Sequence, residues 1–103
     1  MINYKSLTIE DLKKDYSDRF GFIFASNVRS SDTAIENLCQ TLITHNITDT
    51  LPEFVSRDSG NTIVFVYPED CTFKSGEFYH KSQMLRQMGI AQVDTLAGFL
   101  KDI

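Results

Sequence analysis

The chain has no tryptophan, two cysteines, two prolines and only five glycines in 103 residues. Cys39 and Cys71 form no Cys-x-x-Cys pair and have no paired histidines nearby, so neither a redox motif nor a zinc site is indicated. The scattered glycines match neither a dinucleotide-binding motif nor a phosphate-binding loop. We therefore expect no cofactor and no bound metal.

Long hydrophobic runs are also missing. No stretch approaches the ~20 apolar residues that a membrane-spanning helix needs. Residues 1–5 lack the basic and apolar regions of a signal peptide. These absences predict a cytoplasmic protein without membrane contact, whose two cysteines are free thiols in a reducing environment.

Basic residues are outnumbered by acidic ones. Ten Lys and Arg stand against fourteen Asp and Glu, which gives a net charge of −4, and Lys13–Lys14 is the only adjacent basic pair. Proteins that bind nucleic acids usually carry a basic stripe, so we expect no direct contact with nucleic acid. The hydrophobic content of 42% is ordinary for a soluble protein and predicts a single globular domain over residues 1–103.

The clearest structural signal is Thr62–Tyr67, a run of β-branched and aromatic residues between Gly60-Asn61 and Pro68. Such a run predicts a strand that is buried on both faces. A strand of this kind needs helices above and below its sheet. The predicted fold class is therefore α/β (or α+β), with a small single-layer sheet of two to four strands packed with about four helices.

Hydrophobic periodicity predicts the remaining elements. Residues 20–25 form a second strand, and residues 47–61 form a loop with one helical turn at 52–55. The four helices are predicted at residues 8–18 (with a capping box of Thr8 and Asp11), 32–46, 77–88 and 94–102 (capped by Asp94).

The connections between these elements suggest the topology. The helix at 32–46 leaves enough chain for strands 20–25 and 62–67 to pair in parallel through a right-handed crossover. A third strand is expected either in residues 1–5 or in residues 71–75. Residues 84–100 are interpreted as a tight corner between two helices at Gly89. A DNA-binding helix-turn-helix is disfavoured there because the second helix lacks the basic and amide side chains that read the major groove.

Few residues are candidates for catalysis. Cys71 follows the end of a strand, where open α/β sheets place their ligands. Its neighbours Glu69 and Asp70 are negative, however, and negative charge raises a thiol pKa and suppresses the reactive thiolate. We assign no catalytic residue and expect no enzyme. A small enzyme or ligand-binding domain with its site at Pro68–Cys71 remains the first alternative.

The leading hypothesis is a small acidic protein-binding module. Aromatic residues in polar segments, flanked by acids, are typical of a binding patch with steering charge. The expected partner is a protein with a basic surface, and the module would act as an inhibitor, immunity or anti-defence protein that neutralises a nuclease, toxin or defence protein. The candidate partner-binding residues are Phe54, Asp58, Glu69, Asp70, Glu77, Phe78 and Tyr79.

A second alternative is a dimeric structural or regulatory subunit. The two helices expected within residues 77–103 could form the interface, and the flexible side chains of Met84 and Met88 suit an adaptable contact. On this hypothesis the chain forms a homodimer through residues 77–103.

Overall fold

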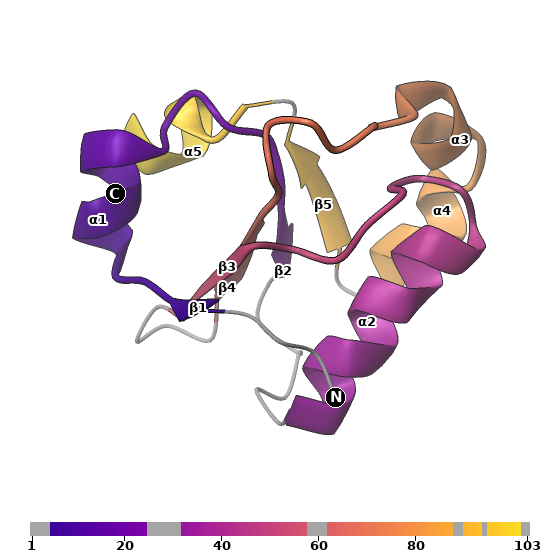
Figure 1. Cartoon of the computed structure of the whole chain (residues 1–103). Helices are drawn as coiled ribbons and strands as arrows, with labels where there is room; N and C mark the ends of the chain where they lie inside the picture. The colour runs from indigo at the N-terminus through magenta and orange to yellow at the C-terminus, as the bar shows by residue number, and fades with distance from the viewer. Residues whose placement is uncertain (1–4, 25–31, 58–61, 88–89, 94, 102–103) are drawn as a thin grey trace.

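In the computed structural model, one β-sheet lies between two groups of helices, with α2, α3 and α4 on one side and α1 and α5 on the other (Figure 1). The structure describes residues 5–24, 32–57, 62–87, 90–93 and 95–101. The strands are β1 (Lys5–Ser6), β2 (Gly21–Phe24), β3 (Phe54–Arg57), β4 (Ile63–Val66) and β5 (Ile90–Val93). The helices are α1 (Ile9–Asp15), α2 (Asp32–Thr44), α3 (Ser75–His80), α4 (Ser82–Gln87) and α5 (Ala97–Lys101).

The sheet has the strand order β1-β3-β4-β2-β5. The four four-residue strands pair antiparallel throughout, and only the two-residue strand β1 adds a parallel pairing, to β3 at one edge. The expected fold class is confirmed in its α+β form. The predicted helix at 77–88 is divided into α3 and α4, since Lys81 lies outside both helices.

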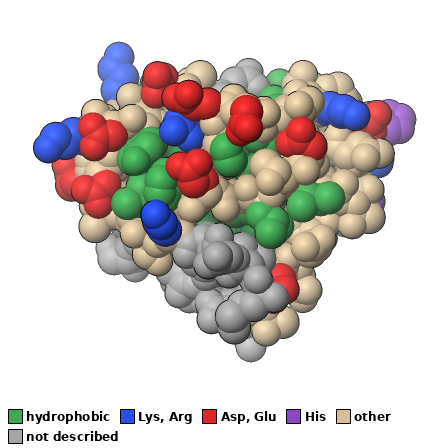
Figure 2. Space-filling model, viewed as in Figure 1, with side chains coloured by type: hydrophobic (Ala, Val, Ile, Leu, Met, Phe, Trp, Pro, Cys, Tyr) green, Lys and Arg blue, Asp and Glu red, His purple; other side chains and the backbone are tan. Residues whose placement is uncertain are grey.

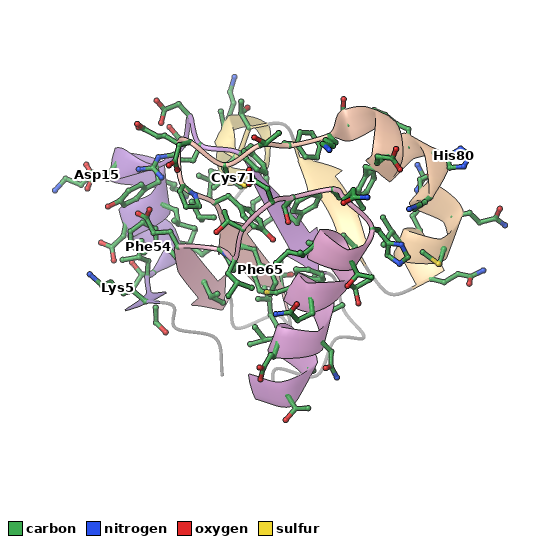
Figure 3. All side chains as sticks on the ribbon, turned by 45° about the vertical axis from the view of Figure 1, so that its right-hand side comes forward. Lys5, Asp15, Phe54, Phe65, Cys71 and His80 are labelled. Carbon is green, nitrogen blue, oxygen red and sulfur yellow. The ribbon has the colours of Figure 1, made fainter. Side chains whose placement is uncertain are left out.

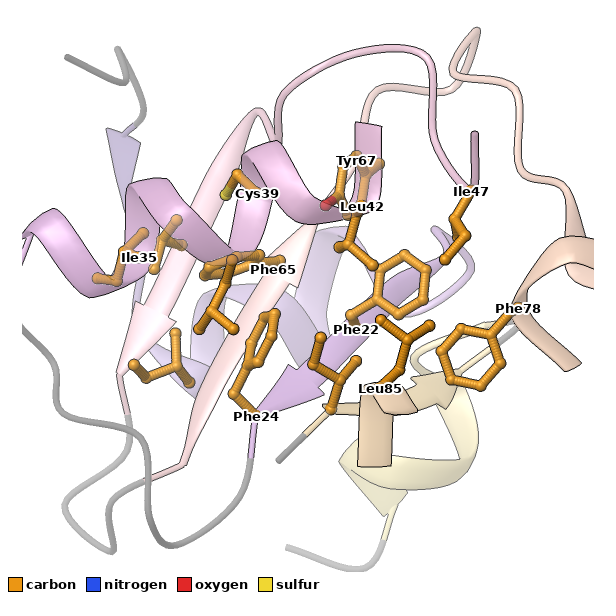
Figure 4. Close-up of a cluster of buried hydrophobic side chains, with 14 residues drawn as sticks. Phe22, Phe24, Ile35, Cys39, Leu42, Ile47, Phe65, Tyr67, Phe78 and Leu85 are labelled. Atoms are coloured by element: carbon orange, nitrogen blue, oxygen red, sulfur yellow. The ribbon is translucent and has the colours of Figure 1, made fainter. Parts of the chain in front are cut away.

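The predicted central strand is confirmed as β4, whose four residues are all buried. Because strand side chains alternate between faces, Ile63 and Phe65 contribute to one core and Val64 and Val66 to the other. The first core joins the sheet to α2, α3 and α4, and Figure 4 shows it (Phe22, Phe24, Ile35, Leu38, Cys39, Leu42, Ile47, Val55, Ile63, Phe65, Tyr67, Phe78, Leu85 and Ile90). The second joins the sheet to α1 and to α5 with the residue before it (Leu12, Phe54, Val64, Val66, Leu96 and Leu100).

The capping box predicted for the first helix is confirmed. The Thr8 hydroxyl accepts a hydrogen bond from the Asp11 backbone N–H at 3.1 Å, and the Asp11 carboxylate accepts one from the Thr8 N–H at 3.3 Å. Two amide groups that have no partner within the helix are thereby satisfied. Helix α1 ends at Asp15, earlier than residue 18.

The predicted helical turn at 52–55 is wrong, because this part of the chain is strand β3. It pairs with β4 in the register Phe54↔Val66 to Arg57↔Ile63. The predicted parallel pairing of strands 20–25 and 62–67 is also wrong, since β2 and β4 are antiparallel. Helix α2 leads instead to β3, which runs parallel to β2, and the β3–β4 hairpin then places β4 between them. Pairing with β4 in this hairpin has overridden the local helical signal at Pro52.

The predicted corner between two helices is wrong as well. Residues Ile90–Val93 form β5, which pairs antiparallel with β2. The last helix begins only at Ala97, and the expected cap Asp94 and the expected corner residue Gly89 lie outside the described residues. Of the two places proposed for a third strand, the first is represented by Lys5 of β1. In the second, Phe73 makes only an isolated bridge with Thr48.

The longest described helix is α2, with 13 residues. Across the described ranges, no helix combines the length and the apolar character needed to cross a bilayer.

Candidate protein-binding surface

Two of the predicted partner-binding aromatics lie in the core. Phe54 is 9% exposed and packs on the Tyr16 ring at a centroid distance of 4.8 Å. Phe78 is 3% exposed and stacks on Phe22 at 5.8 Å. The expectation that these two rings form a binding patch is therefore corrected, because Phe54 points from β3 into the core beneath α1 and Phe78 points from α3 into the core on the other face of the sheet. Asp58 lies outside the described residues.

The other predicted residues are exposed, at two separate places in the fold. Glu69 and Asp70 lie in the loop that follows β4, and the Glu69 side chain is 82% exposed. Glu77 and Tyr79 lie on α3. Tyr79 is 62% exposed, which makes it the most exposed large hydrophobic residue in the part of the chain that the structure describes.

The loops around Glu69 are held together by Arg19. The Arg19 Nε lies 3.5 Å from Glu69 Oε1, and its Nη1 lies 4.0 Å from Glu53 Oε2. Nη1 also donates a hydrogen bond to the Tyr67 carbonyl at 3.2 Å, and the guanidinium lies over the Tyr16 ring, 5.3 Å from its centroid. One arginine therefore connects the Glu53 and Glu69 carboxylates with the backbone at the end of β4.

Asp49, in the segment between α2 and β3, contacts the loop that follows β4. Its Oδ1 accepts a hydrogen bond from the Thr72 backbone N–H at 3.0 Å, and this bond, together with one from the Cys71 thiol, lowers the pKa of the carboxyl. A carboxyl with a lowered pKa stays ionised at neutral pH, so Asp49 adds a negative charge here.

We define the acidic loop face as Asp49, Glu53, Glu69 and Asp70: Glu53 and Glu69 contact Arg19, Asp49 contacts Thr72, and Asp70 follows Glu69 in the loop after β4. Figure 2 shows carboxylates gathered on this side of the molecule, with hydrophobic side chains between them. Sequence reasoning missed Asp49, Glu53 and Arg19. No local signal marks them, because they reach the face through pairing of distant segments, such as the Glu53 N–H donating to the Val66 carbonyl at 2.8 Å.

Cys71, the candidate nucleophile, has the properties of a protonated thiol. Burial, and then its hydrogen bond to Asp49, raise its pKa to about 11. The suppressing carboxylate is thus Asp49, whereas sequence reasoning named Glu69 and Asp70. Burial also raises the pKa of Cys39 to about 12, because this residue of α2 lies in the core. In Figure 3, His80 lies on the outer side of α3, well away from Cys71.

Thiol labelling measures how far the raised pKa lowers the thiolate fraction of Cys71. A rise of two pKa units lowers the thiolate fraction about 100-fold at pH 8, so Cys71 is expected to react with a disulfide reagent about 100-fold more slowly than a free thiol. Asp49→Asn removes the negative charge and is expected to speed the reaction, while labelling in denaturant gives the unperturbed rate. Labelling of the folded protein at the free-thiol rate would contradict the environment described here.

Over the described ranges, no group of three or more His, Cys, Asp and Glu side chains is arranged to hold a metal ion. Comparison with family models, with curated proteins and with solved structures finds no match for this chain.

Proposed function

We propose that the protein is a non-enzymatic binding module that recognises a basic protein surface through the acidic loop face. Its role would be that of an inhibitor or immunity-type protein, which covers the cationic site of a nuclease, toxin or defence protein. The free thiols of Cys39 and Cys71 fit a reducing compartment such as the cytoplasm.

The observation that supports this proposal is that two carboxylates from different loops, Glu53 and Glu69, contact the single arginine Arg19. Glu69 and Asp70 face solvent, while Arg19 and the Asp49–Thr72 hydrogen bond hold their loop in place. A surface that is already ordered loses little conformational entropy on binding. Its negative charge speeds the encounter with a cationic partner, since complementary fields raise association rates.

Half-buried apolar side chains complete the surface. Leu51 and Pro68 lie on the same loops as the carboxylates and are neither core nor fully exposed. Protein interfaces combine such apolar centres with a polar rim, and most of the affinity comes from the centre. The alternative of a small enzyme or ligand-binding domain at Pro68–Cys71 has weaker support, because the raised pKa of the Cys71 thiol opposes nucleophilic chemistry.

The test is association with a panel of basic nucleases at low and high salt. We expect binding at low salt to at least one of them, and an association rate that falls as salt screens the charges. Glu69→Lys with Asp70→Lys is expected to slow association at least 10-fold.

The matched control is Glu10→Lys with Asp15→Lys, which makes the same change of net charge on α1. Binding by this control should change much less than binding by the loop variant. Equal losses in both variants would show that net charge alone is responsible. Absence of binding to every basic partner at low salt would refute the proposed function.

A further inference from the structure

A positive side chain contacts two members of the acidic loop face. Arg19 lies 3.5 Å from the Glu69 carboxylate and 4.0 Å from the Glu53 carboxylate. A face that attracted a basic partner by charge alone would gain nothing from this arginine, because its positive charge cancels part of the attraction and repels the cations of the partner. The presence of Arg19 here therefore needs an explanation other than electrostatic steering.

Arg19 is anchored by groups outside the acidic loop face. Its Nη1 donates a hydrogen bond to the Tyr67 carbonyl at 3.2 Å, and its guanidinium lies over the Tyr16 ring. Its backbone N–H donates to the Tyr16 carbonyl at 3.1 Å, and its backbone carbonyl accepts from the Leu96 N–H at 2.9 Å. The Arg19 side chain is only 18% exposed. A partner that contacted the two carboxylates would leave all of these anchoring contacts intact.

The two carboxylates have fewer contacts than the arginine that they share. Glu53 precedes β3 and Glu69 follows β4, and the Glu69 side chain is largely in solvent. Within the described ranges of the chain, Arg19 is the only cationic side chain in contact with either carboxylate. An exposed glutamate without such a contact populates several rotamers, and a partner must then order it on binding.

Pairing with Arg19 leaves both carboxylates able to bind a partner. Glu69 contacts the guanidinium through Oε1, and Glu53 contacts it through Oε2. A carboxylate can accept several hydrogen bonds, so each can accept from an Arg or Lys of the partner while it still contacts Arg19. Exposed ion pairs are also weak, so the internal contact does not compete strongly with an external one.

We propose that Arg19 is the positioning residue of the acidic loop face and holds the Glu53 and Glu69 carboxylates together for one cationic group of the partner. This role depends on the proposed function, and it specifies which carboxylates act as a pair. The positive charge of Arg19 slows the encounter, whereas its contacts order the two side chains in the complex. Removing Arg19 therefore changes the association and dissociation rates for different reasons.

The experiment measures both rates for Arg19→Gln with a basic nuclease that the wild-type protein binds. The substitution makes the net charge one unit more negative than −4, so a face that works by charge alone would bind more tightly. We expect association to be unchanged or faster and dissociation to become about 10-fold faster. Arg19→Lys keeps the charge, but its ammonium does not reproduce the spread donors of a guanidinium, and it is also expected to speed dissociation.

The matched control is Lys14→Gln, which makes the same change of net charge at an exposed position of α1. Its dissociation rate should equal that of the wild type. Circular dichroism verifies the fold of each variant, and Arg19→Lys alone decides if Arg19→Gln does not fold. Dissociation of the Arg19 variants at the rate of the control, or tighter binding by Arg19→Gln, would overturn the positioning role.

A measurement on the free protein separates this role from the proposed function. NMR relaxation of the side-chain methylene groups reports the order of Glu53 and Glu69 on the picosecond to nanosecond timescale. We expect lower order for both in Arg19→Gln and no change in Lys14→Gln. Unchanged order in Arg19→Gln would count against Arg19 directly. Lower order, together with a wild-type protein that binds no basic partner, would refute the proposed function and leave the ordering of the two carboxylates by Arg19 in place.

Discussion

Gly21→Ala is expected to destabilise the fold by about 3 kcal/mol, because no side chain fits at this position. A β-carbon on Gly21 would overlap the Phe65 backbone oxygen and would lie 2.9 Å from Leu96 Cδ2. Phe65 lies on β4, the neighbouring strand, so its oxygen cannot move aside without disturbing the pairing of β2 with β4. The clash falls at the start of β2, an inner strand, where Gly21 pairs with both Val66 and Val93.

Chemical denaturation measures this effect, with Gly98→Ala as the matched control. Gly98 lies in α5, and a β-carbon there would meet no atom within 4 Å. The control is expected to gain about 0.5–1 kcal/mol, since alanine favours a helix more than glycine does. If the Gly21 variant were as stable as the control, the close approach of β2 and β4 described here would be wrong.

Phe22→Ala is expected to cost about 3–5 kcal/mol of unfolding free energy. The Phe22 ring is fully buried and contacts four other rings, with Tyr67 and Phe73 edge-on at 5.7 Å and Phe78 stacked at 5.8 Å. Its removal leaves a cavity where α3 and the loop after β4 meet the sheet. Because small domains have only about 5–15 kcal/mol of total stability, the loss would be a large share of it.

Urea denaturation followed by far-UV circular dichroism tests this prediction. Tyr79→Ala removes an aromatic ring of similar size from an exposed position, so its cost is expected to be within about 0.5 kcal/mol. Phe22→Leu retains most of the buried volume and should fall between the two. A small effect of Phe22→Ala would mean that the ring cluster does not hold α3 against the sheet.

The candidate surface was only partly predictable from the sequence. Glu69, Asp70 and Tyr79 are exposed as expected, because acids after a proline and a polar stretch around an aromatic are local signals. Arg19 and Glu53 carry no such signal. They are 34 positions apart in the sequence and meet only because β2 and the β3–β4 hairpin lie in one sheet.

The fold, too, divides into parts that local sequence signals predict and parts that depend on strand pairing. By itself, the sequence determined the buried central strand, the capped first helix and the helix predicted at 32–46 (observed as α2, Asp32–Thr44), because each depends on a local run of residues with strong periodicity. Strands β3 and β5 were not predictable in this way. Phe54–Arg57 mixes polar and apolar residues, and Ile90–Val93 is a short run that fits a helix corner equally well.

Only the tertiary structure decided between these possibilities, because backbone groups of four-residue segments gain hydrogen-bond partners only when another strand lies beside them. Pairing with β4 made residues 54–57 a strand, and pairing with β2 did the same for residues 90–93. The same pairing buried Phe54 on the α1 side of the sheet and set Glu53 beside Arg19. Strand order thus determined which side chains form the core and which remain at the surface.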